Sequence, residues 1–252
     1  MKNLGLIFNK VCYQKLGKDT VVDSKDKRTV YQIDLDKHMD EIRTATFDAK
    51  RDYKKSEVAN KIFRLQTSYP GLLIGTGNPH GACSYAGDIV TGFSFDYVTG
   101  QPYIPGSSVK GILRSHFREH PQVITEVAQS VGIEKPIDVK ALEKEIFDGN
   151  DVFLDAVICK GQEGSGLVVG DDYITPHASP VKNPVPIHIL KVLPGVKIEF
   201  RFRLTEGEPE NNGLTAKEKA DLFRELILLF GVGAKTNVGY GAMEPSVGNG
   251  QK

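Results

Sequence analysis

The sequence feature that most constrains this chain is a glycine-rich run placed directly after an amphipathic segment. The run reads GVGAKTNVGYG at residues 231–241, and the segment before it spans residues 215–230. Thr215, followed three residues later by Glu218, is the pattern of a helical capping box, and apolar residues recur at helical spacing up to Phe230. Four glycines in eleven residues allow backbone conformations and close approaches that side chains forbid. The sequence therefore predicts a helix that ends in a tight loop.

This loop has the donors expected of an anion-binding site. Successive backbone amides can form a nest for a phosphate, and Lys235, Thr236 and Asn237 add side-chain donors. Residues 234–236 resemble the GKT of a nucleotide-binding P-loop, but alanine precedes the lysine and the run follows a helix, whereas a P-loop follows a strand. Nucleotide binding is therefore not expected, and the alternative to phosphate binding is a flexible turn without a ligand.

The remaining periodicity indicates an α+β fold. Alternating apolar and polar residues predict strands at residues 62–69, 152–159, 167–174 and 185–204. Helices are predicted at 108–120 and 215–230, with one or two connecting helices within 122–150 and a short final strand after residue 241. This order is that of the split β-α-β, ferredoxin-like (RRM-like) fold. It predicts a domain at 61–245, with an insertion at about 121–184, and a polar tail at 246–252.

Charge is balanced over the whole chain but not along it. The 252 residues hold 32 Lys and Arg against 32 Asp and Glu, so any nucleic-acid surface must be a local patch. Residues 1–64 carry 15 basic and 10 acidic side chains. We expect residues 1–60 to be a charged extension, partly helical or disordered, at the surface. The alternative is that its Lys50, Arg51, Lys54 and Lys55 line a nucleic-acid groove.

The composition also bears on location and cofactors. No apolar run approaches the roughly 18–20 residues that cross a bilayer. The three cysteines, Cys12, Cys83 and Cys159, are too widely spaced for a disulfide framework or a CxxC metal site. We expect a soluble, cytoplasmic protein that has no contact with a membrane and needs no metal or other cofactor.

The predicted helix at 108–120 is the second candidate for phosphate binding. Ser107 and Ser108 are suitable N-caps, and the free amides of a helix N-terminus favour an anion. Lys110, Arg114 and Arg118 lie four residues apart and therefore form one basic stripe. The alternative is an ordinary solvated face. Both signals together favour phosphate binding, and a ferredoxin-like topology allows this helix and the glycine-rich loop to approach each other.

Several residues suggest enzymatic alternatives. His116, Glu119 and His120 fit the inverted zinc motif H-x-x-E-H, but no third ligand is identifiable. His80, in a glycine- and proline-rich loop, is a candidate acid-base group for a ribonuclease. Asp155 and the adjacent carboxylates at 171–172 are more simply surface charge, since neighbouring residues of a strand point to opposite faces. An endoribonuclease acting through His80 or the His116/His120 pair remains the alternative function.

Several stretches together resemble the RAMP superfamily of CRISPR-associated proteins. The run YIPGSSVKGILR at residues 103–114 resembles the start of that superfamily's conserved helix, residues 231–241 resemble its C-terminal glycine-rich loop, and residues 75–79 resemble the loop after its first strand. Further segments at 152–156, 172–177 and 183–187 narrow the resemblance to the sixth-subunit family of the type III-B (Cmr) effector complex. The resemblance covers roughly residues 62–245. One departure is Ala242, which stands where an arginine is frequent.

The resemblance implies a non-catalytic subunit of a ribonucleoprotein that silences invading RNA. It implies a position at the end that holds the 3′ part of the CRISPR RNA, beside the fourth (backbone), fifth (small) and first Cmr subunits, with target RNA met indirectly. We therefore predict a set of RNA-binding residues on the helix and the loop: Ser107, Ser108, Lys110, Arg114, Gly231, Gly233, Lys235, Thr236, Asn237, Gly239, Tyr240 and Gly241.

Overall fold

The computed structural model of the chain describes residues 3–17, 28–77, 89, 91–175, 186–208 and 213–246. Several residues singled out in the sequence, among them His80, Cys83 and the segment at 176–185, lie outside the described residues. No described helix is both long enough and apolar enough to pass through a lipid bilayer.

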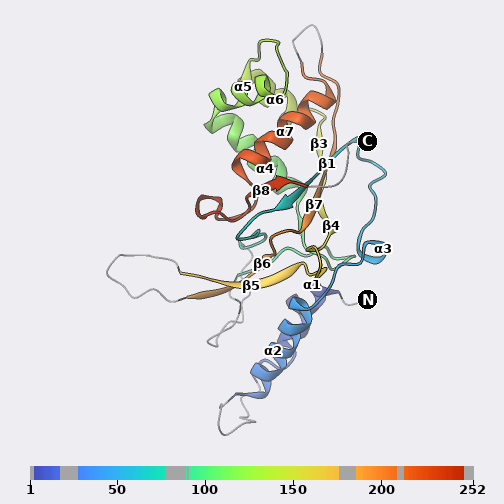
Figure 1. Cartoon of the computed structure of the whole chain (residues 1–252), viewed down its shortest axis with the longest axis vertical. Coiled ribbons are helices and arrows are strands. Elements are labelled where there is room, and N and C mark those ends of the chain that lie inside the picture. Colours follow the sequence, from blue (N-terminus) through green and yellow to red (C-terminus); the bar gives the residue numbers. More distant parts are fainter. Residues whose placement is uncertain are drawn as a thin grey trace, which may run out of the picture.

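A six-stranded antiparallel sheet forms the centre of the molecule (Figure 1). Its strands are β1 (Lys61–Thr67), β2 (Tyr103–Ile104), β3 (Val152–Phe153), β4 (Ala156–Lys160), β7 (Lys197–Arg203) and β8 (Met243–Pro245). They follow the order β2-β4-β7-β1-β8, with β3 also paired to β7. The predicted α+β class is confirmed, and the neighbouring strands β4, β7, β1 and β8 have the order of the split β-α-β, ferredoxin-like fold.

Four helices lie together on one side of this sheet (Figure 1). They are α4 (Gly106–Glu119), α5 (Pro121–Ser130), α6 (Val139–Asp148) and α7 (Ala216–Phe230). An aromatic cluster joins them to the strands, because Phe223 of α7 packs on Phe153 and Phe202, with both ring centroids at 5.5 Å, and Phe147 of α6 packs on Phe153. The predicted helices therefore form the cover of the sheet's apolar face.

A two-stranded hairpin stands apart from the main sheet. It consists of β5 (Val169–Ile174) and β6 (Ile187–Val192), paired antiparallel from Val169 to Ile174. The alternating segment predicted at 185–204 thus contains two strands, because Pro194 and Gly195, the latter at φ +81°, turn the chain between β6 and β7. The strand predicted at 152–159 is likewise divided, into β3 and β4.

The described part of the N-terminal segment is mostly helical. It contains α1 (Leu4–Asn9), the 3-10 turn η1 (Val11–Tyr13), α2 (Val30–Arg43) and α3 (Ala49–Asp52). One side of α2 is buried through Tyr31, Leu35, Met39 and Ile42, which recur at near four-residue spacing among the charges. The interpretation of residues 1–60 as a surface segment therefore does not hold for this side of α2. The division into separate extension and core stays a prediction.

A buried ion pair closes the core beside the start of α7. The ammonium of Lys219 is 0% exposed and donates to Asp151 Oδ2 at 2.8 Å and to the carbonyl of Thr205 at 3.1 Å. Asp151 Oδ1 also accepts from the amide and hydroxyl of Thr205. Because the pair is enclosed and fully hydrogen-bonded, it stabilises the native state only while both partners are present.

Replacing Lys219 by methionine is expected to lower the free energy of unfolding by about 3–5 kcal/mol, since Asp151 would keep a buried charge without its counter-ion. Urea denaturation followed by circular dichroism measures this loss. Lys217→Met, at an exposed position two residues earlier in the same helix, should change the free energy of unfolding by less than about 0.5 kcal/mol. Equal effects of the two substitutions would contradict the assignment.

Candidate nucleic-acid interface

The glycine-rich loop leaves α7 where the capping pattern and the glycines predict. Thr215 and Glu218 form the complete capping box, and α7 ends at Phe230. Gly231, Gly233, Gly239 and Gly241 all have positive φ. At Gly241 (φ +78°) an added Cβ would overlap the carbonyl oxygen of Val232, and at Gly233 (φ +85°) it would overlap that of Leu73. The loop path therefore depends on missing side chains.

Backbone hydrogen bonds fasten this loop to the turn that follows β1. The amide of Ala234 donates to Leu73 O at 3.0 Å, and that of Gly241 donates to Gly71 O at 2.8 Å. In return, the amide of Ser68 donates to Ala242 O at 2.9 Å. Loop and turn thus form one hydrogen-bonded unit at the junction of β1 and β8.

The middle of the loop points to solvent. Lys235 takes the left-handed conformation at φ +60° and leads into the 3-10 turn η3 (Thr236–Val238). Lys235, Thr236 and Asn237 are all exposed. Within the described chain, the amides of Thr236 and Asn237 have no hydrogen-bond acceptor. This arrangement of unpaired amides beside an ammonium group suits a phosphate oxygen.

Tyr240 is buried and does not lie at the surface of the loop. Its side chain is 7% exposed and packs with Leu73 and Ile189. The hydroxyl donates to Asp172 Oδ2 at 3.0 Å, and Lys191 Nζ donates to the same oxygen at 2.6 Å. Burial, together with the neighbouring carboxylate, raises the pKa of Tyr240 to about 12. The side chain therefore anchors the loop to the β5–β6 hairpin, and its contact with RNA stays a prediction.

Asp171, next to Asp172 in β5, makes its contacts on the opposite face of the hairpin. Asp171 Oδ2 lies 2.9 Å from Arg43 Nη1 of α2 and 2.9 Å from His188 Nε2. Successive residues of β5 thus point to opposite sides, as strand geometry requires. Both carboxylates hold partners of their own chain, so their interpretation as simple surface charge is wrong.

The N-terminus of α4 is occupied by the chain itself. The cap position is Pro105, and the helix begins at Gly106, whose amide donates to Asp155 Oδ1 at 2.7 Å. The prediction that Ser107 or Ser108 caps this helix is therefore wrong, since both lie exposed within its first turn. A carboxylate near this terminus takes a place that a phosphate would otherwise favour.

Acidic side chains of α6 pair with two of the three basic residues of the α4 stripe. Arg114 pairs with Glu143 through Nε and with Asp148 through Nη2 at 2.9 Å, and Arg118 Nε pairs with Glu143 at 2.9 Å. The hydrogen bond between Arg114 and Glu143 raises the pKa of the guanidinium and lowers that of the carboxyl. Lys110 is half-buried, with Nζ 5.8 Å from the ring centroid of Phe153. RNA contacts by Lys110 and Arg114 stay predictions.

The loop and α4 meet through a ring stack and not through their predicted RNA-binding residues. His116 of α4 stacks on Phe230, the residue before Gly231, with ring centroids 4.0 Å apart. Among the described residues, no hydrogen bond or ion pair joins Lys110 or Arg114 to the loop. The loop contacts instead the turn after β1 and the hairpin.

Of the two histidines, His116 lies in an apolar setting, whereas His120 is exposed. Both ring nitrogens of His116 are buried without a hydrogen-bond partner in the described structure, and burial, with His120 nearby, lowers the pKa of His116. His120 also stacks on Phe230, at 5.2 Å. Within the described ranges, no group of three or more His, Cys, Asp or Glu side chains is arranged to hold a metal ion.

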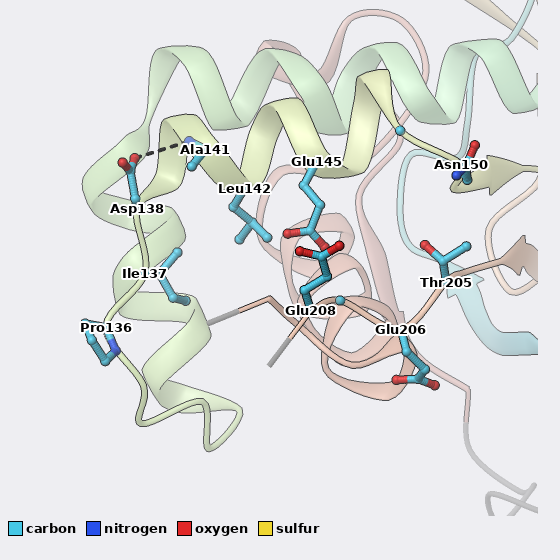
Figure 2. Close-up of a pocket in the computed structure, with 12 residues that line it drawn as sticks. Pro136, Ile137, Asp138, Ala141, Leu142, Glu145, Asn150, Thr205, Glu206 and Glu208 are labelled. Carbon is cyan, nitrogen blue, oxygen red and sulfur yellow. Dashed lines mark hydrogen bonds between the residues drawn. The ribbon is translucent and has the colours of Figure 1, made fainter. Parts of the chain in front are cut away.

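A separate hollow of about 960 Å³ lies between α6 and residues 205–208. Figure 2 shows the carboxylates of Glu145 and Glu208 directed toward each other across it. Asp138 and Glu206 also line it, and these two cap α6 and α7 by accepting from backbone amides. Its negative lining disfavours a polyanion, so this hollow is not the nucleic-acid site.

The sequence of the chain is similar to those of known proteins. A model described as RAMPs, the RAMP superfamily, matches residues 64–244, from the middle of β1 to β8. The chain belongs to the RAMP superfamily. It is similar to the CRISPR system CMR subunit Cmr6 of Saccharolobus solfataricus, with 29% identity over 166 residues, covering 62% of this chain and 49% of that protein. The chain thus spans about half the length of the curated relative it matches.

Two solved structures resemble the chain as well. One is a chain of the type III-B Cmr-beta complex bound to cognate target RNA, with a TM-score of 0.53 and 26% identity, covering 73% of this chain and 57% of that one. The other is Cmr6 from Pyrococcus furiosus, with a TM-score of 0.45 and 20% identity, covering 74% of this chain and 97% of that one. The sequence resemblance to the RAMP superfamily and its Cmr6-like branch is confirmed.

The anchored phenol predicts a distinctive alkaline behaviour. Because the folded pKa of Tyr240 lies near 12 against an ordinary value of 10.0, its hydrogen bond should stabilise the fold fully below pH 10 and progressively less between pH 10 and 12. The difference in free energy of unfolding between wild type and Tyr240→Phe should therefore shrink over that range. Denaturant titrations at several pH values measure it. A difference that stays constant to pH 12 would contradict the assigned anchor.

Proposed function

We propose that this chain is a non-catalytic, RNA-binding subunit of a type III-B CRISPR (Cmr) ribonucleoprotein that contributes to antiviral RNA silencing. Membership of the RAMP superfamily and similarity to Cmr6 support this proposal. The observation that carries it is the exposed turn at Lys235–Asn237, which combines unpaired amides with one ammonium group on a loop held rigidly at both ends.

The loop suits the backbone of a single-stranded RNA better than its bases. Amides and an ammonium group recognise phosphate oxygens, which carry no sequence information. A guide RNA varies in sequence, so a subunit that holds it needs contacts of this kind. The glycines at 231, 233 and 241 let the loop pack closely on its own backbone, and exposed Gly239 adds no side chain beside the turn.

We place the chain at the end of the complex that holds the 3′ part of the CRISPR RNA, in contact with the fourth, fifth and first Cmr subunits. Target RNA then reaches it through the guide. Similarity to a chain from a Cmr-beta structure bound to target RNA supports membership of such a complex, and the placement within it rests on the sequence resemblance. The balanced charge of the sequence also suits a protein whose surface is shared between protein partners and one RNA contact.

The environment of His116 supports a role without catalysis. A general acid or base must reach its substrate proton, whereas both ring nitrogens of His116 are buried against the Phe230 stack. His116→Ala, introduced into the assembled ribonucleoprotein, should leave any RNA cleavage unchanged. Loss of cleavage with the fold intact would favour the endoribonuclease alternative.

Replacing Lys235 by alanine should weaken guide-RNA binding and reduce the slope of log K against log salt by about one unit, the value for one lost phosphate contact. Filter binding at four salt concentrations, with the assembled complex, measures this slope. The matched control is Lys217→Ala, since Lys217 is an exposed lysine in the first turn of α7 and Lys235 follows its last turn.

The same assay weighs the contribution of α4. Because Arg114 is paired with Glu143 and Asp148, Lys110→Ala/Arg114→Ala should change the salt slope less than Lys235→Ala does. An unchanged slope in the double variant would remove α4 from the RNA site. An unchanged slope in Lys235→Ala as well would overturn the proposed function.

A further inference from the structure

A nearly free aromatic ring stands next to the glycine-rich loop. Tyr69 is 81% exposed, and its ring has no ring contact or hydrogen bond with the described residues. It sits in the turn after β1, which is closed by a hydrogen bond from the amide of Gly71 to Ser68 O at 2.8 Å. An aromatic side chain this exposed on a fixed turn leaves a large apolar surface in water.

The turn is bound to the loop on both sides of Tyr69. Ser68, just before it, donates to Ala242, and Gly71, two residues after it, accepts from Gly241. Between these bonds, an added Cβ at Gly239 would lie 3.6 Å from Pro70 Cδ, so the end of η3 and the turn are in contact range. Tyr69 and the loop are therefore held in one fixed relation, without a flexible connection between them.

We propose that Tyr69 is a stacking platform for one base of the single-stranded RNA whose phosphates bind the Lys235–Asn237 turn. The inference rests on the proposed function. A phosphate site and a neighbouring aromatic ring are the two elements by which proteins hold single strands without reading sequence, because every base has a π-face. The ring loses little conformational freedom on binding, since its turn is already fixed.

Two other exposed tyrosines provide controls from the same chain. Tyr97 is 94% exposed but lies beside α1, where the Asn3 side chain donates to its carbonyl at 3.0 Å. Tyr173 is 60% exposed, and its ring stacks on His188, with centroids 4.7 Å apart, on the side of β5 opposite the one that anchors Tyr240. Exposure is thus common to all three, but only Tyr69 adjoins the loop.

The test measures guide-RNA affinity of the assembled ribonucleoprotein containing the full chain, with a guide whose 3′ part is oligouridine. Tyr69→Ala should lower affinity by about tenfold, within the range for one lost base–aromatic stack, and leave the salt slope unchanged. Tyr69→Trp should retain affinity, because it keeps a stacking ring. Tyr97→Ala should bind like wild type. With 5-iodouracil in the guide, irradiation should crosslink Tyr69.

A guide with the same phosphates but abasic 3′ sugars separates stacking from a structural effect. Its affinity should be equal for wild type and Tyr69→Ala, and an equal loss on both guides would overturn the proposal. If Lys235→Ala changes the salt slope but Tyr69→Ala leaves affinity unchanged, the stacking inference fails and the proposed function stands. If Tyr69→Ala instead releases the chain from its partner subunits, the ring is a protein contact and the inference is also overturned.

Discussion

Three main-chain hydrogen bonds between the turn after β1 and the glycine-rich loop hold the candidate site together. They join Leu73, Gly71 and Ser68 to Ala234, Gly241 and Ala242. Because these bonds use only backbone atoms, their requirement on the sequence is for residues that allow close approach, and glycine meets it. The central strand β1, the edge strand β8 and the end of α7 all converge on this junction. The exposed turn at 235–237 has a fixed shape because its two ends are fixed here.

Local charge pairing determines which cations can meet a polyanion. Glu143 and Asp148 occupy Arg114, and Glu199, buried in the sheet, accepts from Arg64 at 2.9 Å and Arg201 at 2.8 Å. The sequence holds 32 basic and 32 acidic residues. The side chains named here neutralise one another through direct ion pairs within the fold. In the described structure no carboxylate pairs with Lys235. Unpaired Lys235 is therefore a stronger candidate for phosphate binding than the basic stripe of α4, whose arginines are already paired.

Sequence patterns predicted the elements well where local chemistry decides them. The capping box at Thr215 and the alternation of β1 and β7 follow from local sequence patterns. The sequence could not identify hydrogen-bond partners that lie far apart along the chain. Asp155 reaches Gly106 across 49 positions, and Asp172 reaches Tyr240 across 68. Only a three-dimensional arrangement brings such groups together.

The same reason explains why the helical face of α2 was missed. Its four buried side chains are separated by charges, so the average polarity of the segment conceals a regular apolar side. The average composition of this segment reflects its many charged residues, whereas the spacing of its apolar residues shows which side of the helix is buried. The signal was present in the spacing of Tyr31, Leu35, Met39 and Ile42. Here periodicity is a better guide than charge density.

The neighbouring carboxylates of β5 have a mechanical consequence. Asp171 is joined to α2 through Arg43, and Asp172 is joined to the end of the glycine-rich loop through Tyr240. Strand β5 therefore links an N-terminal helix outside the matched family region to the glycine-rich loop that follows α7. A tilt of the hairpin would displace both attachments at once, so the packing of α2 bears on the position of the glycine-rich loop.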